Sequence, residues 1–243
     1  MTARMVKRQR RTLVKITQDG KKYGLTFPIA QARELAKAPL PYEHEERKTD
    51  KITIRHEPNE ITVKYNGKRP LKMAVREFLQ LQKQLRETLY FSIPLKTLFE
   101  RNPQSNIHAL PPRLRECHLI LPKMDGWELN WNLMPLALSK NNAYIVITAK
   151  PSRPDTMALW HLPELDDEDI RKRLPKPDDE NKETPTYAKR VQRTRKDGKS
   201  RIYAAVKPHP SLAILITATS PPKKGKEAAV ALDLLAREME LAE

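Results

Sequence analysis

Apolar and polar residues alternate along the start of the chain in the way that β-strands require. The alternation runs through residues 12–17, breaks at Asp19-Gly20, and resumes in residues 23–27 until Pro28. An Asp-Gly pair between two such runs is a strong signal for a β-hairpin. Residues 29–37 then carry apolar side chains at helical spacing. The sequence therefore predicts a hairpin followed by a short amphipathic helix.

A second hairpin and a longer helix are predicted downstream. Residues 51–56 and 60–65 alternate around Glu57-Pro58-Asn59, which favours a turn. From Leu71 to about Tyr90 the apolar residues fall at helical spacing, and Pro70 suits the first turn of that helix. We expect the apolar stripe to lie in the core or, alternatively, to form a dimer contact. The opposite face carries the basic residues Arg76, Lys83 and Arg86.

Strand patterns return in the second half of the chain and indicate a folded sheet. Met124-Asp125-Gly126 and Asp197-Gly198 mark two hairpin turns there. Residues 143–149 are rich in β-branched side chains and apolar on both faces, so they predict a central strand. The predicted strands of this half are 117–121, 127–133, 143–149, 187–195, 200–206 and 212–218, and the chain ends with a predicted helix at 228–241.

These elements predict the α+β class. We expect an N-terminal β-hairpin–helix–β-hairpin module, a long amphipathic helix, and then a mainly antiparallel sheet with flanking helices. Composition shifts and the prolines at 111 and 112 set the expected boundaries. The predicted parts are a basic arm at 1–10, the hairpin module at 11–67, a helical segment at 68–110, and an α+β domain at 111–243 with a mobile linker near 175–186.

The N-terminal pattern resembles the swapped-hairpin DNA-binding domain of the AbrB/MazE/SpoVT family. The matching features are the basic strand 12–17, the turn Asp19-Gly20-Lys21-Lys22, the run Leu25-Thr26-Phe27-Pro28, and the closing hairpin 51–65. The resemblance implies that two chains interleave their hairpins, that basic residues near the first hairpin face DNA, and that the protein regulates transcription. One departure is the segment 37–50, which is longer than the usual turn and contains no glycine.

The charge of the chain indicates what kind of partner it binds. The 243 residues carry a formal net charge of +16, and the isoelectric point is about 9.9. Such an excess of positive charge favours a polyanion, of which nucleic acid is the usual one. The sequence contains no apolar run long enough to suggest a membrane partner. With no secretory signal pattern and a lone Cys117, we expect a cytoplasmic protein.

The basic residues gather on the first and last predicted hairpins. A two-stranded ribbon fits the major groove of duplex DNA, and Arg can read guanine or clamp phosphates. Tyr187 and Tyr203, beside the last hairpin, are candidate stacking platforms for single strands. The candidate nucleic-acid-binding residues are Arg8, Arg10, Arg11, Lys15, Lys21, Lys22, Lys189, Arg190, Arg193, Arg195, Lys196, Lys199 and Arg201.

Catalytic and metal-binding signals are weak in comparison. No two histidines are spaced as metal ligands on a helix, and no phosphate loop, nucleophile elbow or dinucleotide motif occurs. We therefore expect no metal, no cofactor and, on balance, no enzyme. Three functions stay open: a DNA-binding regulator, with DNA favoured over RNA and a homodimer expected; a subunit of a larger RNA-guided or replication assembly; and a Mg²⁺-dependent nuclease.

Overall fold

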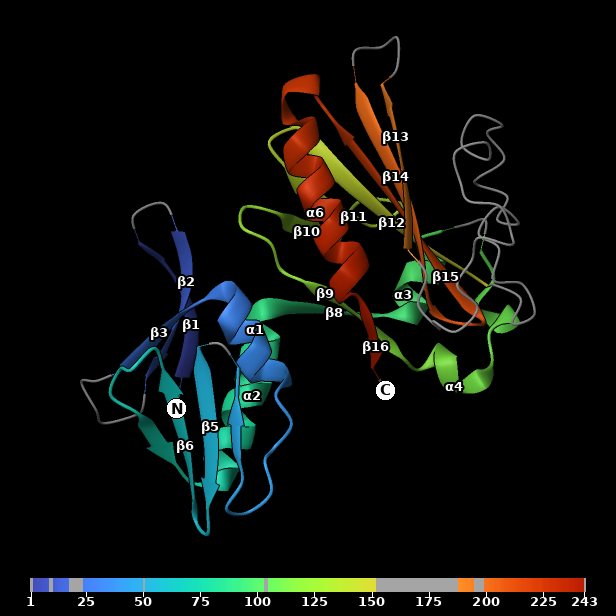
Figure 1. Cartoon of the computed structure of the whole chain (residues 1–243). Coiled ribbons are helices and arrows are strands. Elements are labelled where there is room, and N and C mark those ends of the chain that lie inside the picture. Colours follow the sequence, from blue (N-terminus) through green and yellow to red (C-terminus); the bar gives the residue numbers. More distant parts are fainter. Residues whose placement is uncertain are drawn as a thin grey trace. The chain divides into compact units, whose positions relative to one another are not determined.

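The computed structural model of the chain is an α+β protein whose strands pair in antiparallel fashion (Figure 1). It describes residues 2–8, 11–17, 24–49, 51–102, 105–151, 188–194 and 199–242. The chain divides into two compact units, Met1–Tyr90 and Phe91–Glu243. Each unit is described by itself below.

Unit 1 contains two sheets and two helices. The first sheet has the order β1-β2-β3 and the second has the order β4-β5-β6-β7. Both predicted hairpins are confirmed, as β2 with β3 and as β5 with β6, and the short helix lies at the predicted residues. The elements are β1 Thr2–Arg8, β2 Arg11–Thr17, β3 Gly24–Pro28, α1 Ile29–Lys37, β4 Glu46–Lys48, β5 Ile52–Glu57, β6 Glu60–Tyr65, β7 Leu71–Met73 and α2 Val75–Leu89.

The segment expected to be a basic arm contains a β-strand. Residues 2–8 form β1, which pairs with β2 along its whole length. At the end of this ladder the hydroxyls of Thr2 and Thr17 lie 2.8 Å apart and share a hydrogen bond. The density of basic residues suggested a tail, and the adjacent apolar residues Met5 and Val6 give no alternation that would have predicted a strand. Pairing with β2 also satisfies the backbone hydrogen-bonding groups of the segment.

The long helix begins later than predicted. Residues Leu71–Met73 form β7, which pairs with β6, and α2 starts at Val75. The Glu77 carboxylate accepts a hydrogen bond from the Ala74 backbone N–H at 3.0 Å, which fixes this start. Pro70 therefore precedes a strand instead of entering the first helical turn. The sequence could not show whether residues 71–73 form a strand or the start of the helix, because so short an apolar segment fits the period of a strand and the period of a helix.

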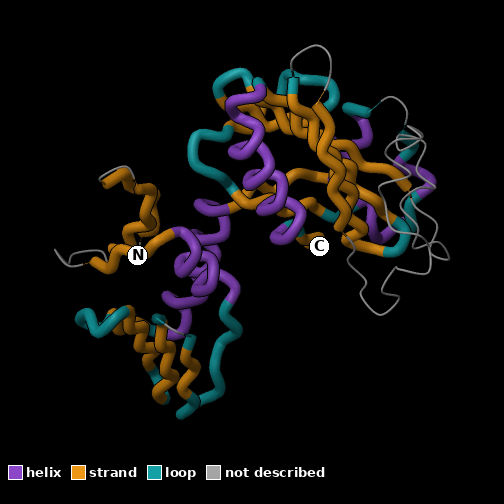
Figure 2. The backbone as a smooth tube through the Cα atoms, turned by 45° about the horizontal axis from the view of Figure 1, so that its top comes forward, coloured by secondary structure: helices purple, strands orange, loops and turns teal. Residues whose placement is uncertain are grey.

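The two helices of unit 1 lie side by side, and α2 caps the end of α1 (Figure 2). The Gln82 amide donates hydrogen bonds to the carbonyls of Leu35 at 3.0 Å and Ala38 at 2.7 Å. Arg86 donates from Nε to the Ala36 carbonyl at 3.0 Å. The last carbonyls of a helix have no partner within the helix, so these side chains satisfy groups that would otherwise be orphaned. Arg86 is exposed, as predicted for the face opposite the apolar stripe, and its guanidinium also reaches the end of α1.

Gln82→Ala is expected to destabilise unit 1 by about 1–3 kcal/mol, because it leaves two carbonyls in a largely buried site without a donor. Urea denaturation followed by circular dichroism would measure the change in the free energy of unfolding. Gln80→Ala is the matched control on the same helix, since Gln80 is exposed. That control is expected to change stability by no more than about 0.5 kcal/mol. Equal losses in the two variants would contradict the capping role.

Unit 2 is built around a six-stranded sheet with the order β10-β11-β12-β15-β14-β13. A smaller sheet has the order β16-β9-β8. The predicted hairpin with arms at 187–195 and 200–206 is confirmed as β13 paired with β14. The elements are β8 Tyr90–Pro94, α3 Leu95–Glu100, η1 Ile107–Ala109, α4 Pro112–Arg115, β9 His118–Pro122, β10 Glu128–Asn130, β11 Ala137–Lys140, β12 Ala143–Pro151, β13 Ala188–Thr194, β14 Ser200–His209, β15 Leu212–Ser220, η5 Pro222–Lys224, α6 Gly225–Glu238 and β16 Glu240–Ala242.

The hairpin predicted between residues 117–121 and 127–133 is wrong. β9 pairs with β16, whereas β10 pairs with β11 in the other sheet. The predicted turn exists, with Gly126 at a φ of +73°, but it sends the chain from one sheet to the next. Lys140 holds this turn by donating from Nζ to the Asp125 carbonyl at 2.6 Å. Alternation predicts the strands, but it does not say which strands pair.

The C-terminal segment also differs from its prediction. The helix α6 ends at Glu238, and residues 240–242 form β16, which pairs with β9. Met239, which joins these two elements in the sequence, is buried and belongs to the core of the unit. The apolar residues at 239 and 241 continue the helical stripe, so the pattern alone did not show the end of the helix.

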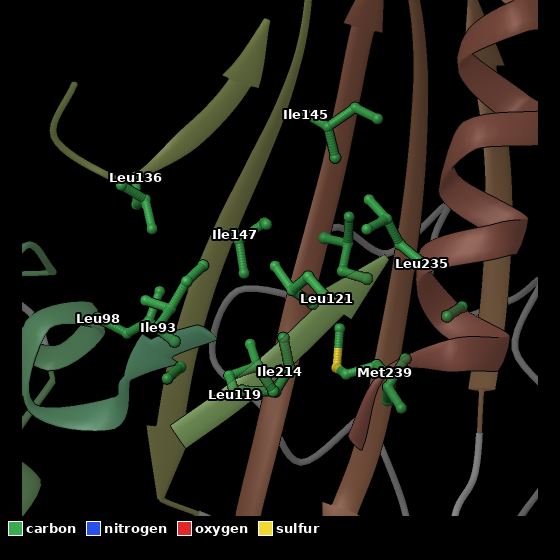
Figure 3. Close-up of a cluster of buried hydrophobic side chains, with 14 of the residues drawn as sticks. Ile93, Leu98, Leu119, Leu121, Leu136, Ile145, Ile147, Ile214, Leu235 and Met239 are labelled. Atoms are coloured by element: carbon green, nitrogen blue, oxygen red, sulfur yellow. The ribbon is translucent and has the colours of Figure 1, made fainter. Parts of the chain in front are cut away.

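The core of unit 2 lies on one face of the six-stranded sheet (Figure 3). Ile145 and Ile147 of β12 and Ile214 of β15 point toward Leu235 of α6 and Leu121 of β9. The central position of β12 is confirmed, because it lies between β11 and β15. Its other face is exposed at one end, where Tyr144 is 43% exposed, and buried at the other end, at Lys150.

The unit boundary falls between Tyr90 and Phe91. The sequence placed boundaries near residues 67 and 110. The strand β7 and the helix α2 instead lie within unit 1, because β7 extends its second sheet and α2 caps α1. The prolines at 111 and 112 begin the short helix α4 within unit 2. The predicted linker near 175–186 lies outside the described residues.

Candidate nucleic-acid interface

The first sheet of unit 1 places basic residues directly opposite one another. Arg4 of β1 is in register with Lys15 of β2, and Arg8 is in register with Arg11. Val14 lies between these positions in β2 and is fully buried. Because successive residues of a strand alternate between faces, Arg4 and Lys15 share the face that turns away from the core.

This arrangement leaves positive charge uncompensated. Like charges at opposed positions of a ladder destabilise it. The three strands of the sheet contain no Asp or Glu. Arg4 is exposed and Lys15 is half-buried, and neither side chain forms an ion pair or hydrogen bond within the part of the chain that the structure describes. A polyanion on this face would supply the missing negative charge.

The second sheet of unit 1 provides an internal comparison. Three of its basic residues have acidic partners: Lys48 with Glu46 at 2.7 Å, Arg55 with Glu57 at 2.9 Å, and Lys72 with Glu60 at 2.7 Å. The hydrogen bond from Lys48 lowers the pKa of Glu46, and the bond to Glu60 raises the pKa of Lys72. This sheet has an ordinary charge-balanced surface, so the absence of acids from β1–β3 is a property of that sheet alone within unit 1.

Most of the six-stranded sheet of unit 2 shares this property, and the exception is Glu128 in the edge strand β10. The strands β11, β12, β13, β14 and β15 contain no Asp or Glu. In the β13–β14 ladder, Arg193 is in register with Arg201, and Lys189 with Ala205. Arg190 is in register with Ala204.

The predicted residues fall into two groups in two different units. Arg8, Arg11 and Lys15 lie on the β1–β2 ladder, and Lys189, Arg190 and Arg193 lie on β13. Lys199 precedes β14, and Arg201 lies near its start. The remaining candidates lie outside the described residues: Arg10, Lys21, Lys22, Arg195 and Lys196, together with Tyr187.

Two kinds of residue were missed by the sequence reasoning. Arg4 was read as part of an arm, and only the register shows that it opposes Lys15. Lys150 and Lys207 were not considered at all, yet both are buried on the six-stranded sheet. Lys150 is in register with Ala213, and burial lowers its pKa. A lysine in a strand of small and β-branched residues gives no sequence signal that it will be buried.

Unit 1 also contains an apolar cleft of about 450 Å³ between α1 and the β4–β5 ladder. Leu35, Ile52 and Ile54 contribute to its lining. Arg47 and Lys48 at its rim already form ion pairs with Glu45 and Glu46. The cleft is therefore a poorer candidate for an anion than the open face of the first sheet.

The described residues show no sign of two other kinds of site. Within the ranges given above, no group of three or more His, Cys, Asp or Glu side chains is placed to hold a metal ion. None of the helices in those ranges combines the length and the apolar character needed to cross a membrane.

Comparison with known proteins does not identify the family of this chain. No protein-family model matches the chain, and no curated protein matches it in sequence. The function proposed below therefore depends on the charges and register of the chain itself.

Proposed function

We propose that this protein is a non-enzymatic nucleic-acid-binding protein that binds duplex DNA on the β1–β2–β3 sheet and acts as a regulator. The observation that carries the proposal is the opposition of Arg4 to Lys15, and of Arg8 to Arg11, in a sheet without acidic residues. An arrangement that costs stability in the free protein is explained if a polyanion compensates it.

The shape of the ladder suits duplex DNA. Strands of a small β-sheet can enter the major groove, which is about 12 Å wide, and their basic side chains can contact phosphates or base edges. The resemblance to the swapped-hairpin family supports the same assignment, because in that family the first hairpin faces DNA. Dimerisation through interleaved hairpins belongs to this proposal.

The first experiment is a titration of the purified protein against duplex DNA, single-stranded DNA and RNA at about 50 and 200 mM salt, with and without Mg²⁺. A protein that contacts several phosphates loses orders of magnitude in affinity over that range. Preferred, salt-dependent binding of duplex DNA without cleavage is the expected result. Equal affinity for all three at both salt concentrations, or no binding at all, would overturn the proposal.

A second candidate is a subunit of a larger nucleic-acid-processing assembly. The observation that favours it is the presence of basic strands without acidic residues in both units. A subunit that uses both sheets would prefer RNA or single strands to a duplex in the same titration. Strand cleavage in the Mg²⁺ samples would instead indicate the nuclease that the sequence left open.

A further inference from the structure

The helix α6 begins at the end of the six-stranded sheet where β15 ends and β14 starts (Figure 1). The short turn η5 lies between Ser220, the last residue of β15, and Gly225, the first residue of α6. Ser200, the first residue of β14, is in register with Ser220. We call the group formed by Ser200, Ser220 and residues 223–227 the helix-start cluster.

The two serines of the helix-start cluster are buried and face α6. Ser200 is 5% exposed and Ser220 is 2% exposed. Ile202 and Ala218, two positions along each strand, belong to the core that α6 covers, so the serines lie on the same face. Neither serine hydroxyl forms a hydrogen bond within the described part of the chain. Buried hydroxyls are normally paired because an unpaired one costs stability, so these two are available to a ligand.

The Ser200 hydroxyl points at the first turn of α6. Its Oγ lies 3.2 Å from the position that a Cβ on Gly225 would occupy. No side chain caps α6, and the N–H of Gly225 bonds to the Pro222 carbonyl. The N–H groups that follow in the first turn have no partner within the helix. A hydroxyl and open amide donors therefore lie at the same place.

The start of α6 also carries positive charge without a partner. Lys223, Lys224 and Lys226 lie there, and none of them forms an ion pair or a hydrogen bond in the ranges that the structure describes. The N-terminus of a helix has a partial positive charge, so lysines at this end are unfavourable in the free protein. An anion at the helix-start cluster would compensate both the helix and the lysines.

The acidic residue of this turn already has a partner. Glu227 forms an ion pair with Lys140 at 2.7 Å, and Lys140 also donates from Nζ to the Asp125 carbonyl at 2.6 Å. Lys199, which precedes Ser200, has interactions of its own. We therefore count none of these three side chains as available, and the charge left at the cluster is that of the three lysines.

We infer that the helix-start cluster of unit 2 binds a phosphate monoester group. Its oxygens accept hydrogen bonds from the first-turn N–H groups of α6 and from the Ser200 hydroxyl, and the lysines supply the opposite charge. Helix N-termini bind phosphate because the N–H groups and the helix dipole both favour an anion. A monoester has three terminal oxygens and a charge of about −1.5 to −2 at neutral pH, so it uses several donors at once.

The test is isothermal titration calorimetry of the full chain in a phosphate-free buffer of low ionic strength. Inorganic phosphate and thymidine 5′-monophosphate are the probes, and thymidine is the control ligand without phosphate. Both probes are expected to bind and thymidine is not. Tighter binding of the monophosphate would identify a nucleotide as the source of the phosphate, whereas equal affinity would identify free phosphate. A dinucleotide with one phosphodiester should bind more weakly than the monophosphate, because it lacks the second charge.

Ser200→Ala tests the hydroxyl. It is expected to weaken binding of inorganic phosphate by about 10- to 100-fold, the effect of one hydrogen bond to a charged group. The free variant should melt no earlier than the wild type, because the substitution breaks no hydrogen bond of the described residues. Ser211→Ala is the matched control, since Ser211 is a buried serine at the other end of the β14–β15 hairpin. That control should bind phosphate as the wild type does.

A triple variant tests the charge. Replacing Lys223, Lys224 and Lys226 by glutamine is expected to weaken phosphate binding by about tenfold or more. The control removes the same charge from exposed lysines on other elements, by replacing Lys51, Lys83 and Lys96 with glutamine. Its affinity for phosphate should stay near that of the wild type.

The outcomes separate this inference from the proposed function. It is overturned if the wild-type chain binds neither probe, if it binds the phosphodiester as tightly as the monophosphate, or if a folded Ser200→Ala variant keeps full affinity for phosphate. Equal losses in the two triple variants would also overturn it. The variant with alanine at residues 4 and 15 should bind inorganic phosphate normally, so duplex binding by unit 1 and phosphate binding by unit 2 can fail independently.

Discussion

Replacing Arg4 and Lys15 together by alanine is expected to reduce the salt dependence of duplex DNA binding by almost two phosphate contacts. Each contact contributes about −0.9 to the slope of log affinity against log salt, so the slope should become less steep by about 1.8. The ratio of wild-type to variant affinity should then be about tenfold larger at 50 mM than at 200 mM salt. Anisotropy titrations of a labelled duplex at four or five salt concentrations would measure this slope.

The control for charge is the double variant Arg55→Ala with Lys72→Ala. It removes the same two positive charges, but from the sheet in which both side chains already have acidic partners. Its salt slope is expected to stay near that of the wild type. A similar change in the two double variants would mean that net charge, and not the face formed by Arg4 and Lys15, governs binding.

The variant should also remain folded. Because Arg4 opposes Lys15, the substitution relieves a repulsion in the ladder and removes no ion pair of the described residues. We expect the free energy of unfolding to be unchanged within about 0.5 kcal/mol, or slightly increased. A melting curve for the variant checks that a loss of affinity reflects lost contacts.

Leu235→Ala is expected to destabilise unit 2 by about 2–5 kcal/mol. Leu235 is fully buried where α6 lies against the sheet, and it points toward Ile145 and Ile214 (Figure 3). Truncation removes apolar contacts and leaves a cavity that the rigid sheet fills only in part. Guanidinium denaturation, followed by circular dichroism, would measure the free energy of unfolding.

Val230→Ala provides the matched control on the same helix. Val230 is 68% exposed, so its truncation is expected to change stability by about 0.5 kcal/mol or less. A Leu235→Ala variant as stable as the control would contradict the position of α6 on the sheet. The Leu235 variant should keep its duplex binding if that activity belongs to unit 1 alone.

Local patterns in the sequence determined the elements whose partners are close along the chain. The hairpins around Asp19-Gly20 and Asp197-Gly198, and the short helix 29–37, follow from alternation, turn chemistry and helical spacing. In each of these the interacting residues are near neighbours, so a short window of sequence contains the information. The net charge likewise indicated a polyanionic partner without any structure.

The tertiary structure decided the pairings between distant segments. Alternation in residues 118–122 and 128–130 predicts strands, but their edges find partners in different sheets. The basic start of the chain forms a strand because β2 is available to pair with it. Residue Arg86 caps α1 because the two helices meet there. None of these contacts leaves a local pattern.

The same distinction applies to the candidate surfaces. The sequence shows how many basic residues there are, but only the register shows that Arg4 opposes Lys15. Strand alternation has a period of two, so one step of register moves every side chain to the opposite face. The sequence by itself therefore determined the charge and the hairpins of this protein. The tertiary structure decided which face carries that charge, because the pairing of distant strands sets the register.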